Sequence, residues 1–265
     1  MTTSTATILP RREPPGPTRP DGRTSDLLVL GGYTSDGQPT GAVYFWALSR
    51  FPGDFEVGLH WHYGLEILSV ILDGTLSHYD TATCQWADLH PGDAQLMWAG
   101  SGVYHNERFL TGTRGFQVQF DPGPAASVPA EPSYTDYPAA SFSAYLLGDA
   151  LVTDLVGGYG PVEARTEGLS VRRIAAPNGA RAELQVGADR VTLGYLIEGT
   201  AVIDATKAAA GDLISLDGTT MTIHATAPAD LLVVSVPAHP SYDPLRLNPE
   251  DLQDHRPPFP AAGAP

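Results

Sequence analysis

The sequence predicts an all-β protein made of two β-barrels in tandem, with few and short helices. Three observations lead to this prediction. The chain of 265 residues contains many short runs of β-branched, aliphatic and aromatic residues. Its 28 glycines and 24 prolines break these runs at close intervals, which favours turns over long helices. A weak internal repeat divides the chain into two similar halves.

The apolar runs have the length and spacing of strands in a sandwich or barrel. Clear examples are residues 42–47, 66–72, 116–120, 191–197 and 231–236. Helical candidates are limited to short pieces at 141–148 and 249–255. The chain is therefore expected to be almost entirely strand and turn.

The internal repeat is carried by glycine turns. LDGTL at residues 72–76 corresponds to IEGTA at 197–201, and each is followed by a Gly-Asp pair, at 92–93 and 211–212. Glycine suits such turns because it adopts positive φ without strain. We expect one barrel over residues 26–140 and a second over 141–248. The boundary is expected between Pro122 and Gly160, an interval that includes most of the stretch DPGPAASVPAEPSY, which is rich in proline as a connector is. The ends, 1–25 and 249–265, are predicted to be disordered tails.

Charge and composition narrow the class of partner. The formal net charge is −15, from 30 acidic against 15 basic residues, which disfavours direct binding to nucleic acid or to an anionic membrane. Cys84 is the only cysteine, so no internal disulfide can form. The sequence also lacks an apolar run of membrane-spanning or signal-peptide length. We expect a cytoplasmic protein that binds neither nucleic acid nor a membrane directly.

The chemistry is concentrated in two alternating pairs. His60 and His62 flank Trp61, so on a strand both imidazoles share one face. His105 and Glu107 repeat this arrangement, and the same parity carries Glu66 to the histidine face if its strand stays regular. A lone histidine on a strand is more often a core residue than a ligand. Two such pairs in a glycine-punctuated β pattern instead favour a shared metal site.

That donor set suits a divalent transition metal. Imidazole binds Fe, Mn, Ni, Cu or Zn, and one carboxylate offsets part of the charge. Four protein ligands on an octahedral ion leave two positions for substrate or O₂. A structural zinc site is closed and usually rich in cysteine. We therefore predict a reactive centre, with catalytic roles expected for Glu107 and Glu66.

The sequence around these histidines resembles the pirin branch of the cupin superfamily. The matching segments are HWHYGLE at 60–66, LDG at 72–74, SHYD at 77–80, LHPGD at 89–93, MWAGSGVYHNE at 97–107, GFQVQF at 115–120 and EPSY at 131–134. The resemblance is strong over about residues 55–140 and only architectural beyond. It implies two cupin (jelly-roll) barrels, with one iron-type metal in the first.

The resemblance places the metal ligands at His60, His62, His105 and Glu107, with Fe(II) as the expected ion. In ordinary cupins the glutamate four residues after the second histidine is a ligand, so Glu66 remains the alternative carboxylate. Pirins usually have proline between the two histidines and arginine after the second. Here Trp61 and Tyr63 occupy those places, which puts the family's usual substrate in doubt.

The second barrel is expected to lack a metal. Counting by the repeat places Gln185, Gly187, His224 and Thr226 where the first barrel has its ligands. His78 and His90 are expected in or near solvated turns. His239 and His255 lie in the C-terminal region without a partner pattern.

Three hypotheses follow for function. Several pirin-like proteins have been linked to quercetin 2,3-dioxygenase activity, which implies a metal-dependent dioxygenase acting on a polyphenolic or enolic compound. The metal would lower the pKa of a bound hydroxyl, and a carboxylate would accept its proton. Four aromatic residues near the motifs are candidates for the lining of a flat pocket: Trp61, Trp98, Tyr104 and Phe109. The alternatives are a non-oxidative metal-dependent isomerase, cyclase or lyase, and a metal-bound, redox-sensing regulatory protein.

Overall fold

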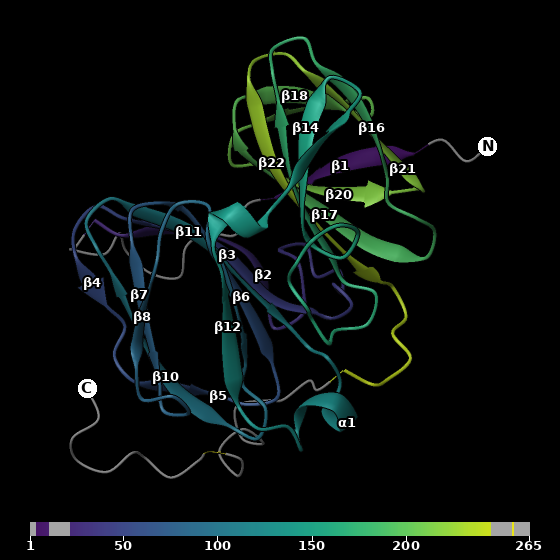
Figure 1. Ribbon diagram of the computed structural model, residues 1–265. Helices are drawn as coiled ribbons and strands as arrows, with labels where there is room; N and C mark the ends of the chain where they lie inside the picture. The colour runs from purple at the N-terminus through teal and green to yellow at the C-terminus, as the bar shows by residue number, and fades with distance from the viewer. Residues whose placement is uncertain (1–3, 11–21, 245–255, 257–265) are drawn as a thin grey trace. The chain divides into compact units, whose positions relative to one another are not determined.

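The computed structural model describes residues 4–10, 22–244 and 256, and almost every element in it is a strand (Figure 1). The only helical pieces in this part of the chain are α1, Pro124–Ser127, and a 3-10 turn at Ala139–Ser141. The all-β prediction is confirmed. Two compact units are present. We call the described residues within 13–32, 42–139 and 242–265 the N-terminal barrel, and those within 1–12, 33–41 and 140–241 the C-terminal barrel.

The N-terminal barrel is built from two antiparallel sheets. The larger has the order β12-β9-β6-β11-β3-β2, and the smaller has the order β4-β10-β7-β8, with β5 also paired to β10. Their bounds are β2 Thr24–Leu30, β3 Val43–Phe51, β4 Phe55–Glu56, β5 His60–His62, β6 Glu66–Asp73, β7 Leu76–Asp80, β8 Trp86–Leu89, β9 Ala94–Trp98, β10 Val103–Phe109, β11 Thr113–Phe120 and β12 Ser133–Tyr137.

The apolar part of the N-terminal barrel's interior is divided. Ile67, Met97, Ala99 and Val103 form one buried cluster. A second, Ile71, Leu76 and Leu89, lies further along β6. Each cluster draws on both sheets, so these side chains mark the inward faces of the strands. Polar side chains occupy much of the remaining inward face.

The C-terminal barrel has the same two-sheet plan. A seven-stranded sheet has the order β1-β20-β17-β22-β15-β14-β13, and a four-stranded sheet has the order β16-β21-β18-β19. Their bounds are β1 Thr5–Leu9, β13 Ala144–Leu147, β14 Ala150–Val156, β15 Ser170–Ala176, β16 Arg181–Gln185, β17 Arg190–Glu198, β18 Thr200–Ile203, β19 Thr206–Ala209, β20 Leu213–Asp217, β21 Thr220–Ala225 and β22 Ala229–Pro237.

A single aliphatic cluster fills the C-terminal barrel. It contains alanine, valine, leucine, isoleucine and methionine side chains from both sheets, among them Leu196, Ile203, Met221 and Leu231. Along β21 the buried residues alternate with more exposed ones, as expected for a strand with one face on a core. This unit has the interior of an ordinary β-sandwich.

The repeated glycine turns explain why the two units share a plan. Gly74 joins β6 to β7 with φ of +75°, and Gly199 joins β17 to β18 with φ of +79°. A Cβ on Gly199 would lie 1.8 Å from the Pro228 carbonyl oxygen, and one on Gly74 would lie 2.5 Å from Thr113 Cα. Positive φ and close backbone approach both require glycine here.

The chain ends and short helices differ from expectation. Residues 1–25 are not simply a disordered tail, because Thr5–Leu9 forms β1 and pairs antiparallel with Leu213–Asp217. The predicted helix at 141–148 is also wrong: Ala144–Leu147 forms β13, an edge strand paired with β14. Its alternating exposed and half-buried residues have the period of a strand. The predicted helix at 249–255 lies outside the described residues, as does the C-terminal tail apart from Arg256.

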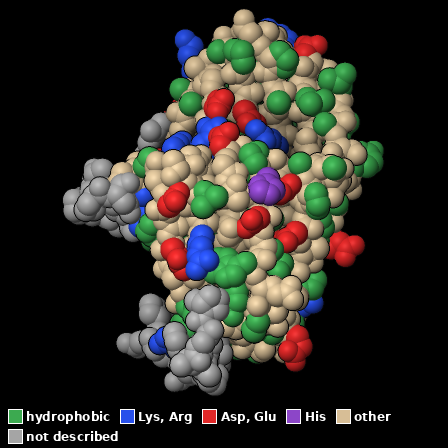
Figure 2. Space-filling view, turned by 60° about the vertical axis from the view of Figure 1, so that its left-hand side comes forward, with side chains coloured by type: hydrophobic (Ala, Val, Ile, Leu, Met, Phe, Trp, Pro, Cys, Tyr) green, Lys and Arg blue, Asp and Glu red, His purple; other side chains and the backbone are tan. Residues whose placement is uncertain are grey.

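The surface mixes charges of both signs. On the face shown in Figure 2, acidic and basic side chains lie beside one another among scattered hydrophobic ones. Ion pairs such as Arg172–Asp154 and Arg173–Asp230 belong to the C-terminal barrel. Within the described ranges, no helix is both long enough and apolar enough to cross a membrane.

Candidate metal centre

Three neighbouring strands of the smaller sheet carry the candidate site. The central strand, β10, pairs with β5 on one side and β7 on the other. His60 lies directly opposite His105 in the β5–β10 register. Alternation then places His60, His62, His105 and Glu107 on one face of the sheet. The first step of the prediction, that the two motifs converge, is confirmed for the three histidines.

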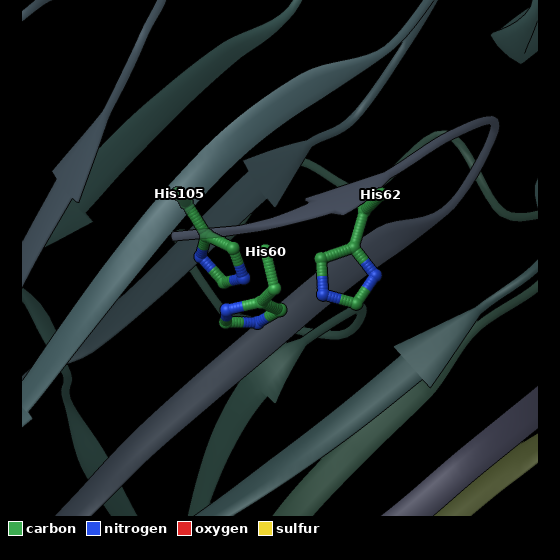
Figure 3. Close-up of side chains that lie close together, drawn as sticks. All are labelled: His60, His62 and His105. Carbon is green, nitrogen blue, oxygen red and sulfur yellow. The ribbon is translucent and has the colours of Figure 1, made fainter. Parts of the chain in front are cut away.

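The three imidazoles point toward one another (Figure 3). One nitrogen from each of His60, His62 and His105 lies within 4.8 Å of the others. The ring centroids are 4.1 Å apart for His60 and His105, 4.9 Å for His62 and His105, and 5.2 Å for His60 and His62. This spacing suits three ligands around one ion.

Hydrogen bonding leaves metal-binding nitrogens free. His60 Nδ1 lies 3.0 Å from the Gly58 carbonyl oxygen, so this nitrogen donates and Nε2 keeps its lone pair. His62 Nε2 and both ring nitrogens of His105 are buried without a hydrogen-bond partner. Buried polar atoms normally have a partner. These orphaned nitrogens are therefore chemically suited to an ion.

Burial keeps these imidazoles neutral. Desolvation lowers the pKa of His62 to about 3, with a smaller contribution from neighbouring His60. The same two causes, burial and then the adjacent histidines, hold the pKa of His105 well below its usual value, and burial also lowers the pKa of His60. A neutral ring is the form that binds metal. The site is thus in its ligand-ready state at neutral pH.

Glu107 adjoins the cluster but is not one of its three members. It is 5% exposed, and burial raises the pKa of its carboxyl group to about 7. Gln117 Nε2 donates to Glu107 Oε1 at 3.1 Å, and Gln119 Nε2 approaches Gln117 Oε1 at 3.4 Å. A short chain of amides on β11 therefore orients the carboxylate. Its role as fourth ligand stays a prediction.

Glu66 does not reach the histidine face. Gly64, with φ of +67°, lies between β5 and β6 and breaks the strand on which the parity argument depended. Glu66 instead begins β6 in the larger sheet, opposite Trp98 on one side and Phe120 on the other. Its neighbour Ile67 packs into the barrel, so Glu66 lies on the opposite face of β6. The register separates it from the histidines.

Sequence reasoning missed His78. It was expected in a solvated turn, but it lies in β7 and is 1% exposed. The register pairs His78 with Glu107 and Asp80 with His105, so both β7 residues face the same way as the site. Burial lowers the pKa of His78 to about 4, against the opposing effect of Asp80. The alternation Leu76, His78, Asp80 was the available signal. His90 is exposed, as expected.

Most of the predicted aromatic lining faces elsewhere. Trp61 and Tyr104 are a cross-strand pair on the face of β5 and β10 opposite the histidines. Trp98 follows the inward-facing Met97 and therefore faces out. Phe109 shares the parity of His105 and stacks on Phe51 with ring centroids 3.8 Å apart. The flat aromatic pocket is thus wrong for three of its four members.

In the C-terminal barrel, β21 carries His224, the residue that the internal repeat matches to His105. Met221 and Ile223 enter the aliphatic core, so His224 faces away from it. His224 lines an open hollow of about 540 Å³ on that outer face, together with Arg181, Glu183 and Asp204. The position equivalent to His105 therefore points out of the barrel.

Comparisons with known proteins agree with this picture. The Pirin family model matches residues 47–119. A quercetin 2,3-dioxygenase of Escherichia coli K12 is 25% identical over 184 residues, covering 68% of this chain and 76% of that protein. A pirin-like protein of Caulobacter vibrioides is 31% identical over 114 residues, covering 41% of this chain. The match spans 39% of that protein's length, and 39% of a 35% identical Zymomonas mobilis relative.

Solved structures resemble the whole fold. The bacterial pirin YhhW of Escherichia coli, in complex with nickel(II), superposes with a TM-score of 0.70 at 17% identity, covering 89% of this chain and all of that one. A quercetin 2,3-dioxygenase of Acinetobacter baumannii gives a TM-score of 0.71 at 21% identity, with 85% and 90% coverage. The two-barrel fold is thus similar to that of solved bacterial pirins and quercetin 2,3-dioxygenases. The histidine cluster draws on residues 60–105, inside the segment that matches the Pirin family model.

Proposed function

We propose that the chain is a metal-dependent dioxygenase acting on a polyphenolic or enolic small molecule. The observation that carries the proposal is the cluster of three neutral imidazoles on the inward face of the barrel, two of which have orphaned nitrogens. Two comparisons support it: one solved pirin binds nickel(II), and several relatives are named quercetin 2,3-dioxygenase. We expect one divalent ion per chain. Fe(II) is the ion that the resemblance to pirins implies, and Mn, Ni, Cu and Zn are also compatible with the donors.

The residues present fit such an ion. His60, His62 and His105 would hold it, and Glu107 is the carboxylate proposed as fourth ligand. A bound ion would supply Lewis acidity toward a substrate oxygen and redox chemistry toward O₂. Three imidazoles leave coordination positions open, which a closed structural site does not.

The protein's own groups handle orientation and protons. Glu107 lies on the inward face and is oriented by Gln117, so it is placed to accept a proton from a substrate hydroxyl. Glu66 was the other candidate base, but the register turns it away from this face. The barrel walls keep bulk water from His105, which is only 1% exposed, whereas His60 and His62 are half-buried.

Oxygen uptake tests the proposal directly. Purified protein loaded with Fe(II), Mn(II), Ni(II) or Cu(II) should consume O₂ when quercetin is added. His62→Ala should abolish uptake, while His90→Ala, at an exposed turn, should not. Absence of uptake with every metal would refute the oxygenase assignment. Turnover without O₂ would instead favour an isomerase, cyclase or lyase, and a specific protein partner without turnover would favour a regulator.

A further inference from the structure

We propose that His78 is a substrate-binding residue that hydrogen-bonds a hydroxyl group of the ligand held at the histidine cluster. This inference rests on the proposed function for the ligand's identity, but it concerns a different strand. The ligand class it defines is an aromatic compound with an oxygen for the metal and at least one further hydroxyl.

The geometry is that of three adjacent strands with one face in common. On one side of β10, strand β5 contributes His60 and His62 to the cluster. On the other side, β7 presents His78 opposite Glu107 and Asp80 opposite His105. A ligand reaching the cluster from the barrel interior therefore also meets the β7 pair. The His78 and His105 ring centroids are 5.4 Å apart.

The β7 pair has unused hydrogen-bonding capacity. Both ring nitrogens of His78 are buried without a partner, and so is Asp80 Oδ2. Asp80 Oδ1 is fully engaged, since it accepts from the backbone nitrogens of Ala82 and Thr83 and from the Thr83 hydroxyl. One carboxylate oxygen thus fixes the turn after β7 while the other stays free. Buried groups of this kind are normally satisfied by a ligand or by ordered water.

The chemistry of these atoms selects hydroxyl groups. A neutral imidazole offers one N–H donor and one acceptor nitrogen, whereas a carboxylate only accepts. A hydroxyl can donate its proton to Asp80 Oδ2 while accepting from the N–H of His78, or donate it to the acceptor nitrogen of His78 instead. The Tyr134 ring packs edge-on against His78, with centroids 5.0 Å apart at 74°, and limits rotation of the imidazole. The ring is therefore held ready for a ligand rather than for another protein group.

Two variants separate this role from metal binding and from packing. His78→Phe keeps a planar ring and removes both nitrogens, while His78→Gln restores a donor and an acceptor. Exposed His90→Phe is the matched control. Each is prepared with one equivalent of Ni(II) and titrated with quercetin and with 3-hydroxyflavone, which keeps the 3-hydroxyl and 4-carbonyl but lacks the other hydroxyls. Metal content is measured on the same samples.

We expect His78→Phe to weaken quercetin binding by roughly 3- to 10-fold, the effect of one lost hydrogen bond. It should leave 3-hydroxyflavone nearly unchanged, and His78→Gln should recover part of the loss. Equal binding of quercetin to wild type and His78→Phe overturns the inference, as does loss of the metal in His78→Phe. Wild type that binds quercetin without consuming O₂ refutes the proposed oxygenase and leaves the His78 inference standing.

Discussion

The two barrels share a strand plan but differ in what they enclose. The C-terminal barrel is filled by one continuous aliphatic cluster. Between the two sheets of the N-terminal barrel, the apolar clusters of Ile67 and of Ile71 share the inward face with polar side chains. These polar residues are His78, His105, Glu107, Gln117 and Gln119. The ring nitrogens of His78 and His105 are buried without hydrogen-bond partners, and such burial costs stability. The comparison indicates that one unit is built for stability and the other retains costly groups for function.

The largest expected effect concerns the metal. His62→Ala removes one of the three imidazoles, and we expect it to lose several kcal/mol of metal affinity. His224→Ala, at the equivalent region of the C-terminal barrel, should retain full stoichiometry because His224 faces away from that core. Elemental analysis after dialysis measures both. Full metal content in His62→Ala would contradict the proposal that the N-terminal barrel, and not the C-terminal one, binds the metal through its histidines.

The next effect tests the core of the C-terminal barrel. Leu231 is fully buried in the aliphatic cluster, so Leu231→Ala should lower the free energy of unfolding by about 2–5 kcal/mol through lost burial and a cavity. Leu146→Ala is the control, since Leu146 is 73% exposed. Circular dichroism during urea unfolding follows the change. A loss below about 1 kcal/mol would show that this interior is loosely packed.

The third prediction is a pH dependence confined to the N-terminal barrel. All four tryptophans of the chain, at positions 46, 61, 86 and 98, lie in this unit, so their fluorescence reports its unfolding. His62 and His78 have pKa values of about 3 and about 4 when folded, and about 6.5 when unfolded. The unfolded state therefore binds more protons below pH 6.5, and stability falls on acidification.

Between pH 7 and pH 5, each of these two histidines should lower the free energy of unfolding of the metal-free protein by about 2 kcal/mol. Glu107 acts in the opposite direction, because its folded pKa of about 7 lies above the unfolded value. On acidification the folded protein protonates Glu107 at a higher pH than the unfolded chain does. This raises the free energy of unfolding by about 2 kcal/mol over the same interval. Glu107→Gln should therefore steepen the acid loss. An identical pH profile in wild type and Glu107→Gln would contradict the assigned burial of this carboxyl group.

Much of the difference between the two barrels could be predicted from the sequence, and the predictions that were wrong have identifiable physical causes. The alternation of His60 with His62, and the glycine turns at Gly74 and Gly199, identified the histidine face and both barrels. Glu66 was misplaced because a break at Gly64 restarts the strand in another sheet, which periodicity alone does not reveal. Strand β1 was missed because its partner, β20, is some two hundred residues away in the chain.

The prediction that His78 lies in or near a solvated turn was wrong for a different reason. Its strand is short and begins directly after a glycine turn, so the local pattern suggested exposure, whereas burial here is imposed by the sheet that covers it. The same holds for the aromatic lining. Trp61 and Tyr104 are close to the ligands in sequence, yet alternation turns them to the outer face. Sequence gives the parity within a strand, and tertiary packing decides which parity is inside.

The smallest expected effect addresses the cost of the polar interior itself. Because both nitrogens of His78 lack a partner in the folded protein, replacing this ring by phenylalanine removes an unsatisfied group at little change in shape. We expect the metal-free His78→Phe protein at pH 7 to be as stable as wild type or up to about 1 kcal/mol more stable. Tryptophan fluorescence during urea unfolding measures the difference. A destabilisation above about 2 kcal/mol would mean that His78 holds the fold together, and the division between a stabilising barrel and a functional one would then fail at this residue.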